Sequence, residues 1–296
     1  MPLVAEMPNV INVSDFALAS TLECGQAFRW SRTADCWFEG VVGKEVWHLR
    51  QRNHEVEWKV VSPLSHRPSP IAVSRYLALD VSLPQILATF PDDPLLRQAS
   101  TEHLGLRVIR QEPWECLASF MASSTKQIVQ IRQIVAEVAR RFGEPIDDTH
   151  HAFPSVSAVA RATHQQLWDC KLGFRAKNML AAARMIDGGQ LDLDALRSME
   201  YDHALEELMK LPGVGEKIAN CTLLFACGFN HAFPIDVWIE RALRRIYFNG
   251  KKRVTARELR EFTRTHFGPY AGWAQQYLFV QERTSGGKAV LQVRAK

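Results

Sequence analysis

Short runs of aromatic and β-branched residues alternate with polar residues over residues 26–62, which is the pattern of half-buried β-strands. Gly43-Lys44 supplies a turn within this stretch. The residues that mark the strands are Phe28, Trp30, Trp37, Val41, Val46, Trp47 and Leu49. The pattern predicts an antiparallel meander that fills most of the first 100 residues, and prolines from Pro63 onward end it.

From about residue 101 the apolar spacing changes to three and four residues, the period of an amphipathic helix. The clearest face consists of Ile128, Ile131, Ile134, Val135 and Val138. Ser124 and Thr125 precede that face as candidate N-caps. Further helices are expected over 163–170, 175–186, 203–210, 216–228, 237–248, 255–266 and 270–283. The predicted class is α+β, with a small N-terminal antiparallel sheet domain at 1–100 and a mostly α-helical domain at 101–296.

The composition is that of an ordinary globular protein, since 47% of the 296 residues are apolar and 23% are charged. Long disorder and a coiled-coil rod are excluded. The longest charge-free run, residues 218–235, is interrupted by Asn, His and Pro, so no membrane association is expected. The N-terminus lacks the pattern of a secretory signal. We therefore expect a cytoplasmic (nucleoid) location in a bacterium and a nuclear one in a eukaryote.

Positive charge is concentrated at the C-terminal end of the chain. The formal net charge is +4, but the segment from Glu240 to the end holds 13 Lys/Arg against 4 Asp/Glu. Such a segment suits a polyanion such as nucleic acid. A solvated basic face without a partner explains the charge equally well.

The cysteines and the ligand-like histidines give no sign of a metal centre. The six cysteines, at 24, 36, 116, 170, 221 and 227, include no C-x-x-C pair, so we expect buried reduced thiols. Asp147, Asp148, His150 and His151 stand together between two helical patterns. An exposed connecting loop is the favoured interpretation there, and no metal is predicted.

The most informative local motif is the segment Leu211-Pro212-Gly213-Val214-Gly215, which joins two predicted helices. Its glycines permit positive φ and close approach, and the N-terminus of the second helix suits a phosphate. The spacing is neither that of a P-loop nor that of a dinucleotide-binding fingerprint. A plain helix–helix connection competes with a DNA-binding helix-hairpin-helix.

Lys217 and Asp236, which lie near this hairpin, are candidate catalytic residues. Lys217 lies in the first turn of the second helix, where the helix dipole favours loss of its proton and so a nucleophilic amine. Cys221 shares its face. Asp236 precedes the next helix and is by local pattern an N-cap, although a carboxylate near Lys217 also stabilises a cationic transition state.

These motifs together resemble the eukaryotic-type 8-oxoguanine DNA glycosylases, which belong to the helix-hairpin-helix/Gly-Pro-Asp superfamily. The hairpin, Lys217 and Pro234-Ile235-Asp236-Val237 resemble the superfamily, and the lysine marks its bifunctional branch. The blocks that resemble the narrower family are Cys24–Trp30, Arg110–Pro113 with Glu115–Leu117 and Ser123-Ser124, Leu172–Ala176 and Gly268–Gln275. The resemblance runs from about residue 10 to about residue 283.

The resemblance implies a role for each matching residue in catalysis and base recognition. Lys217 is expected to attack C1′ of the damaged nucleotide and form a Schiff base, with Asp236 as electrostatic support. The Gly25 carbonyl is expected to accept a hydrogen bond from N7–H, which 8-oxoguanine has and guanine lacks. Cys221 and Phe279 are expected to contact the two faces of the flipped base, and Gln275 is expected to bind its Watson–Crick edge. Cys221 is also expected to pair, as a thiolate, with the Lys217 ammonium.

Contacts to the duplex follow from the same resemblance. Phe174 is expected to wedge into the gap that the base leaves, and Arg175 to contact the opposite base. The hairpin residues Gly213, Val214 and Gly215 are expected to bind backbone phosphate. The residues expected along the opposite base are Thr125, Lys126 and Gln127.

Four positions depart from the family pattern, and one of them is Phe174, which stands where the family's wedge is often Tyr and keeps the ring without the hydroxyl. Thr125 follows the Ser-Ser pair where the family usually has Asn, and Gln130 stands where the family has Arg. Both family residues help to read the cytosine opposite the lesion, so we expect a relaxed preference for cytosine. Trp238 replaces a frequent His.

Three functions are therefore compared. The first is a bifunctional glycosylase/AP lyase that excises 8-oxoguanine from duplex DNA in base excision repair. The second is a related glycosylase for another damaged base such as an alkylated purine, and the third is a non-catalytic helix-hairpin-helix DNA-binding protein. No cofactor is required, a monovalent cation at the hairpin carbonyls is an option, the partner is double-stranded DNA, and a monomer is expected.

Overall fold

The computed structural model describes residues 9–61, 69–248, 251 and 253–284. Its N-terminal part is a five-stranded antiparallel sheet in the order β1-β5-β4-β3-β2. The strands are β1 (Asn9–Asn12), β2 (Trp30–Arg32), β3 (Phe38–Val42), β4 (Glu45–Arg52) and β5 (Glu55–Val61). The predicted meander is confirmed, and β1 is an edge strand that the sequence pattern did not predict.

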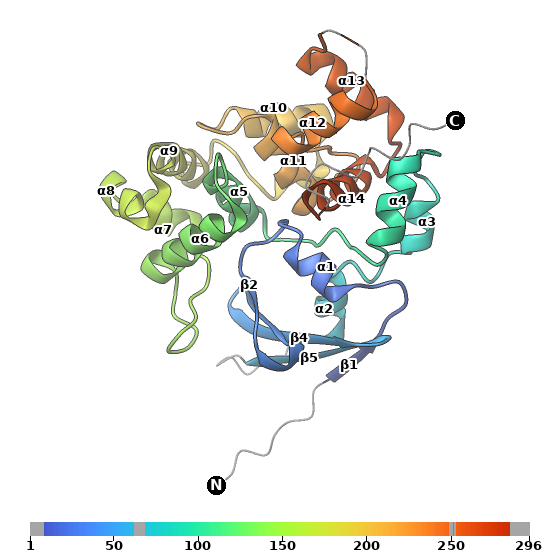
Figure 1. Ribbon diagram of the computed structural model, residues 1–296. Coiled ribbons are helices and arrows are strands. Elements are labelled where there is room, and N and C mark those ends of the chain that lie inside the picture. The colour runs from blue at the N-terminus through green and yellow to red at the C-terminus, as the bar shows by residue number, and fades with distance from the viewer. Residues whose placement is uncertain (1–8, 62–68, 249–250, 252, 285–296) are drawn as a thin grey trace.

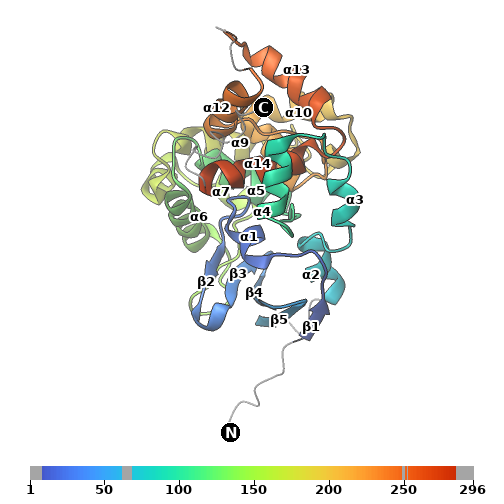
Figure 2. The same ribbon diagram turned by 45° about the vertical axis from the view of Figure 1, so that its right-hand side comes forward.

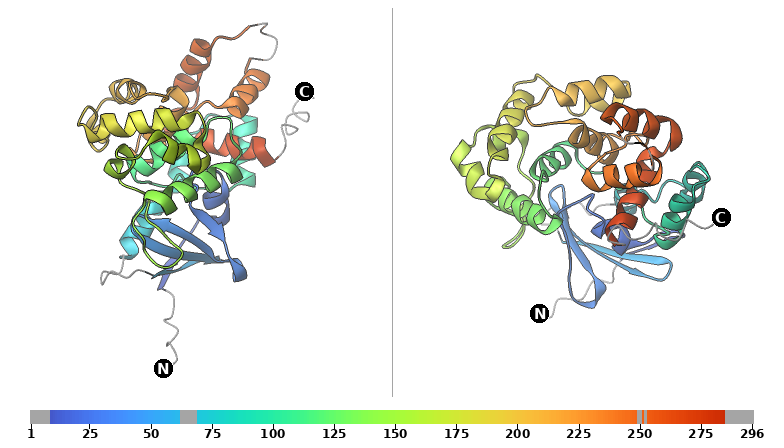
Figure 3. Two further views of the ribbon diagram at one scale, coloured as in Figure 1. Left: turned by 90° about the vertical axis from the view of Figure 1, so that its left-hand side faces the viewer. Right: turned by 45° about the horizontal axis from the view of Figure 1, so that its top comes forward.

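Aromatic side chains attach this sheet to two short helices, α1 (Leu18–Glu23) and α2 (Pro70–Tyr76). The Trp30 indole donates a hydrogen bond to the Tyr76 hydroxyl at 2.8 Å, and the rings of Trp47 and Tyr76 meet edge-on at 5.5 Å. Both tryptophans are at most 3% exposed, so the sheet buries one face against α1, α2 and the segment around Ile109. Figures 1 and 3 show the sheet at one end of the molecule and the helices beyond it.

The rest of the described chain is helical, as the α+β prediction requires. After α3 (Leu83–Leu87) and α4 (Pro94–Glu102) come α5 (Pro113–Ala122), α6 (Ile128–Phe142), α7 (Val156–Ala160), α8 (His164–Leu167), α9 (Arg175–Asp187), α10 (Tyr201–Met209), α11 (Glu216–Phe225), α12 (Val237–Ile246), α13 (Ala256–His266) and α14 (Ala271–Thr284). Helix α5 is buried along its whole length and packs on α11.

Helix α14 is the other buried centre of the fold, and it packs on α4 and α12 (Figure 2). A Cβ on Gly272 would lie 2.4 Å from the Ala232 carbonyl oxygen, so only glycine fits there. The Trp273 indole donates to the Asn230 side chain at 3.0 Å. The Gly272-Trp273 part of the family motif therefore fixes α14 against the loop that leads to Asp236.

Two local predictions need correction. Helix α6 is capped by Gln127 rather than by Ser124 or Thr125, and the Gln130 side chain accepts a hydrogen bond from the Gln127 amide at 3.1 Å. The reason is a turn closed by Lys126 N–H and the Ser123 carbonyl, which places Thr125 at φ 56°. The second correction concerns the expected buried thiols, because Cys36 is exposed while the other five cysteines are buried.

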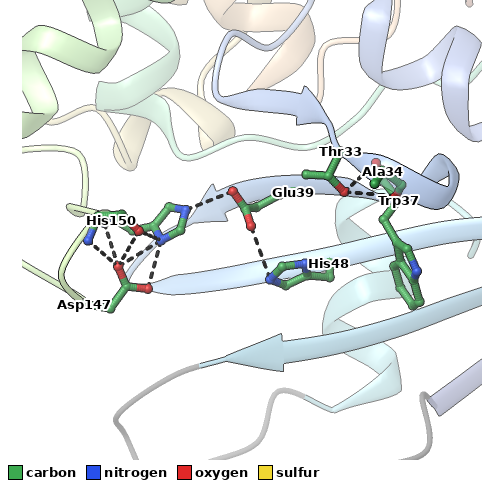
Figure 4. Close-up of polar contacts among 8 residues, drawn as sticks. Thr33, Ala34, Trp37, Glu39, His48, Asp147 and His150 are labelled. Carbon is green, nitrogen blue, oxygen red and sulfur yellow. Dashed lines mark hydrogen bonds and ion pairs between the residues drawn. The ribbon is translucent and has the colours of Figure 1, made fainter.

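The ligand-like segment that follows α6 is a loop, as predicted, and it is fastened to the sheet (Figure 4). His150 Nδ1 lies 2.8 Å from Asp147 Oδ2, and His150 Nε2 lies 3.1 Å from Glu39 Oε1 on β3. Burial lowers the pKa of His150, but its hydrogen bonds to both carboxylates raise the pKa by more. The segment thus holds the helical part against the sheet.

Candidate active site

The hairpin between α10 and α11 places its three expected contact residues in different surroundings. Gly213 has φ +79°, and a Cβ there would lie 2.5 Å from the Asn178 amide nitrogen, so the turn packs tightly on α9. Val214 is 6% exposed and belongs to the core. Gly215 is the N-cap of α11 and faces open space. An approaching phosphate meets backbone here and no side chain, which fits an N-terminal anion site.

Lys217 is the second residue of α11 and is half-buried. Its Nζ donates to the Ser123 hydroxyl at 3.1 Å and lies 4.9 Å from the centre of the Phe120 ring. Both partners belong to the end of α5, so the amine is held on the helix that α11 packs against. Sequence reasoning gave Ser123 no role of its own, although it stands in the Ser-Ser block that carried the resemblance.

Asp236 is the N-cap of α12, as its local pattern predicts, and its Oδ1 accepts from the Ile239 amide at 2.8 Å. Burial raises the pKa of Asp236, while the hydrogen bonds from backbone and the positive charge of Lys217 act in the opposite direction. The carboxylate is therefore costly to hold in its charged form and has the lysine as an electrostatic neighbour. This is the arrangement that stabilises a developing positive charge.

Cys221 lies one turn after Lys217 and is 3% exposed. Burial raises the pKa of this thiol to about 11, more than the charge of Lys217 lowers it. The raised pKa favours a neutral Cys221 thiol over the predicted pairing of a thiolate with the Lys217 ammonium. A neutral thiol is still suited to van der Waals contact with a base.

The expected base contacts come from two segments far apart in the chain. Gln275 and Phe279 are one turn apart on α14, the first 4% exposed and the second half-buried. Among the described residues no group donates a hydrogen bond to Gln275 Oε1, although the atom is buried. A buried amide oxygen without a donor is costly, and a ligand with an N–H group relieves the cost.

Gly25 is positioned by its neighbour Gln26, which sequence reasoning had not singled out. The Gln26 amide donates to the Thr21 and Arg107 carbonyls at 2.8 and 2.7 Å and accepts from the Ile109 amide at 3.0 Å. Gly25 itself has φ +87°, and a Cβ there would lie 2.6 Å from Cδ1 of Ile128. The sequence signal for Gln26 was its place inside the Cys24–Trp30 block.

Phe174 and Arg175 stand at the start of α9 with opposite exposure. Phe174 is 63% exposed, as a wedge residue must be, whereas Arg175 is 5% exposed. The Arg175 guanidinium donates to Thr125 Oγ1 at 2.8 Å and to the Leu172 and Ser124 carbonyls, and it covers the Phe174 ring. Both of its Nη groups are therefore engaged within the protein, while Nε is buried without a hydrogen-bond partner among the described residues.

The residues expected along the opposite base form one surface turn between α5 and α6. Thr125 and Gln127 are exposed and Lys126 is half-buried. The side chain of Gln130 is engaged with the Gln127 amide and so belongs to the helix cap.

A cavity of about 490 Å³ opens beside Lys217, between the hairpin helices and α13. Its walls carry Arg257, Arg260 and Arg264 of α13, and none of the four expected base-contact residues lines it. The expected base contacts and this basic cavity are therefore separate features of the structure. No cluster of metal-ligating side chains occurs among the described residues, and none of their helices meets the length and apolarity that a membrane span needs.

Family models match nearly the whole described chain. Residues 10–117 match the N-terminal domain of 8-oxoguanine DNA glycosylase, and residues 118–265 match the HhH-GPD superfamily of base excision DNA repair proteins. The chain belongs to the HhH-GPD superfamily. The resemblance to 8-oxoguanine glycosylases that the sequence motifs indicated is thereby confirmed.

Two curated relatives of this HhH-GPD chain that align over most of its length are named N-glycosylase/DNA lyase. The N-glycosylase/DNA lyase OGG1 of Arabidopsis thaliana is 29% identical over 93% of this chain and 80% of its own length. The N-glycosylase/DNA lyase of Saccharomyces cerevisiae is 29% identical over 92% of this chain and 85% of its own. Both alignments include the sheet as well as the helical part.

Solved structures agree with this assignment. A structure of MBOgg1 with a low-affinity DNA ligand has a TM-score of 0.86 at 30% identity and covers 94% of this chain and 96% of its own. The Clostridium acetobutylicum 8-oxoguanine glycosylase/lyase with DNA that has cytosine opposite 8-oxoguanine has a TM-score of 0.85 at 28% identity, over 95% and 99% of the two chains.

Proposed function

We propose that this protein is a bifunctional DNA glycosylase/AP lyase that excises 8-oxoguanine from duplex DNA in base excision repair. The observation that carries the proposal is the placement of Lys217 at the start of α11, bound to Ser123, with the half-buried Asp236 carboxylate as its electrostatic neighbour. Support also comes from relatives named N-glycosylase/DNA lyase over nine-tenths of the chain.

In the proposed reaction the damaged base is flipped out of the duplex and Phe174 fills the space it leaves. The Lys217 amine, in its neutral form, attacks C1′ as the glycosidic C–N bond breaks, and the electron pair of that bond leaves with the base, which takes up a proton. Asp236 stabilises the positive charge that develops on the sugar. The C1′–O4′ bond then breaks, O4′ takes up a proton as the sugar ring opens, and the Lys217 nitrogen forms the Schiff base with C1′. The Schiff base acidifies C2′, and loss of a C2′ proton with expulsion of the 3′ phosphate completes the lyase step.

Recognition of the base is assigned to the two segments described above. The Gly25 carbonyl accepts from N7–H of 8-oxoguanine, whereas guanine presents an acceptor to that acceptor. The Gln275 amide binds the Watson–Crick edge, and Phe279 and the neutral Cys221 thiol contact the two faces. The buried Gln275 Oε1, which has no donor among the described residues, supports this assignment.

Two other functions fit less well. A glycosylase for alkylated purines shares the fold, since the 3-methyladenine DNA-glycosylase of Archaeoglobus fulgidus has a TM-score of 0.74 at 20% identity. The Lys217–Asp236 arrangement argues against a monofunctional enzyme of that kind, which needs the aspartate without the lysine. It also argues against a non-catalytic DNA-binding module.

The proposal needs duplex DNA as its only macromolecular partner and a monomer as its working form. It requires no cofactor, and a monovalent cation bound by hairpin carbonyls stays a prediction. Duplex DNA is supported by the C. acetobutylicum structure, which was solved with it. A cytoplasmic (nucleoid) or nuclear location follows from the substrate.

Borohydride trapping tests the proposal. The protein is incubated with three labelled duplexes that carry 8-oxoguanine, an alkylated purine or no lesion, and covalent complexes are counted. We expect a complex with the 8-oxoguanine duplex alone. A complex with the alkylated duplex alone would establish a bifunctional glycosylase for alkylated purines. If no complex forms, release of the free alkylated base would establish a monofunctional form of the second function, and binding without base release would establish the third.

A further inference from the structure

One arginine of α14, Arg283, reaches the expected base pocket. Gln275, Phe279 and Arg283 are spaced four residues apart on α14 and so follow one another along the same face of the helix. The first two are the expected base contacts. Arg283 is exposed as a whole, so its charged group lies where the helix face meets solvent.

The guanidinium of Arg283 touches both walls of that pocket. Its Nη1 donates to the Cys24 carbonyl oxygen at 3.3 Å and would lie 3.5 Å from a Cβ on Gly25. The centre of its guanidinium lies 5.4 Å from the centre of the Phe279 ring. One planar group therefore connects the segment that carries the Gly25 carbonyl with the aromatic ring.

Gln26 fixes the C-terminal side of the Cys24–Gly25 segment, and side chains of α14 bind the Cys24 carbonyl on its other side. Gly25 has no side chain and stands at φ +87°, a conformation that is open to glycine and strained for other residues. The Cys24 carbonyl accepts from Arg283 and, at 3.4 Å, from the Gln276 amide. Since consecutive peptide groups share Cα atoms, the orientation of the Cys24 peptide limits that of the Gly25 carbonyl.

Arginine is suited to this double contact by its shape. A guanidinium donates hydrogen bonds in its plane and packs its face on an aromatic ring at the same time. An ammonium is a point charge that can donate to the carbonyl but covers the ring less well. The chemistry therefore calls for arginine at this position rather than any cation.

We propose that Arg283 is a positioning residue of the base pocket, which fixes the Cys24–Gly25 carbonyl segment against the Phe279 ring and so sets the selectivity for 8-oxoguanine. The inference rests on the proposed function, because it assigns to Gly25 and Phe279 the base contacts described there. It concerns base recognition alone. Lyase action on an abasic site, which has no base, should not depend on Arg283.

The test compares Arg283→Met and Arg283→Lys with the unchanged full-length protein. Single-turnover rates and KM are measured on a duplex with 8-oxoguanine and on a duplex with a preformed abasic site, and guanine release is followed as the selectivity control. Arg97→Met on α4 is the matched control, since Arg97 is exposed and pairs only with the surface residue Asp92 among the described residues. Melting temperatures report on folding.

We expect Arg283→Met to slow 8-oxoguanine excision by about 10- to 100-fold, the usual cost of a misplaced contact, with abasic-site cleavage within twofold of the unchanged protein. Arg283→Lys should recover part of the rate, because it keeps the donor to Cys24. Equal losses on both duplexes, or no loss on 8-oxoguanine, would overturn the inference. If the unchanged protein cleaves abasic sites but does not excise 8-oxoguanine, the proposed function itself fails, which is a distinct result.

Discussion

The two sides of the proposed lesion site differ in what their polar groups are bound to. On the base side, Gln275 Oε1 is buried and has no hydrogen-bond donor among the described residues. On the opposite-base side, Arg175 donates to Thr125 and two carbonyls, and Gln130 accepts from the Gln127 amide. The base side offers a buried amide oxygen that an N–H group of a ligand would satisfy. On the opposite-base side the Arg175 Nη groups and the Gln130 amide oxygen are bound within the chain, although Arg175 Nε is also buried without a hydrogen-bond partner among the described residues.

This contrast coincides with the sequence pattern. Gly25 and Gln275 lie in the family blocks, while Thr125 and Gln130 depart from the family pattern. A polar group that is already paired gains little from a base edge, because one hydrogen bond replaces another. We therefore expect strict recognition of the damaged base together with weak recognition of the base opposite.

The largest expected effect concerns the nucleophile. Lys217→Gln should reduce borohydride trapping to background and slow excision by about a thousandfold or more, since no other amine replaces it. Binding to the lesion duplex should persist. Lys44→Gln is the matched control, because Lys44 is a surface lysine that pairs with Glu144 at 2.6 Å. Borohydride trapping that persists in Lys217→Gln would show that Lys217 is not the nucleophile.

The next effect concerns the charge of Asp236. Asparagine caps helices as well as aspartate does, so Asp236→Asn keeps α12 and removes only the charge. Excision should fall by about 10²- to 10³-fold. Because burial raises the pKa of Asp236, excision by the unchanged protein should also fall as pH decreases through that raised pKa, and this limb should vanish in the variant. A pH–rate profile with the same acidic limb in both proteins would contradict the assignment.

A third prediction distinguishes two effects of adding a side chain at Gly25, which are steric contact with Ile128 and backbone strain at positive φ. Gly25→Ala and Gly43→Ala both place a side chain at positive φ, which costs about 1–2 kcal/mol of stability in each case. A Cβ at Gly43 meets nothing within 4 Å, whereas at Gly25 it lies 2.6 Å from Ile128. Urea unfolding should show similar losses, and only Gly25→Ala should lose excision. Equal activity in the two variants would show that the Gly25 carbonyl is not critical.

The smallest expected effect is a gain in selectivity for the base opposite the lesion. Thr125 has φ 56°, a conformation that asparagine tolerates better than threonine does. Thr125→Asn should therefore stabilise the turn slightly and restore an amide that can bind cytosine. We expect selectivity for cytosine over the other three bases to rise by about 5-fold or more, the lower bound for one good base contact. Unchanged selectivity would mean that the turn does not reach the opposite base.

Sequence reasoning was most successful where function depends on local pattern. The hairpin, the Asp236 cap and the position of Lys217 at a helix start are each specified within a few residues, and the structure has them as expected. The β1 strand was not predicted because its four residues show only one short alternation of apolar and polar positions. The strand is defined by its pairing with β5.

Long-range contacts were beyond the sequence pattern. Ser123 binds Lys217 across 94 positions, and Arg175 binds Thr125 across 50. The pKa of Cys221 likewise depends on burial by distant elements, which the predicted thiolate did not take into account. Propensity and spacing carry no information about such partners, since tertiary packing decides them.

Single-turnover excision of 8-oxoguanine placed opposite C, T, G and A tests the central contrast most directly. Strict recognition of the lesion with weak recognition of its partner predicts excision from all four duplexes, with a rate opposite C within about 100-fold of the others. An undamaged duplex should release no guanine. A rate opposite C about a thousandfold above every other pair, or release of undamaged guanine, would contradict the account.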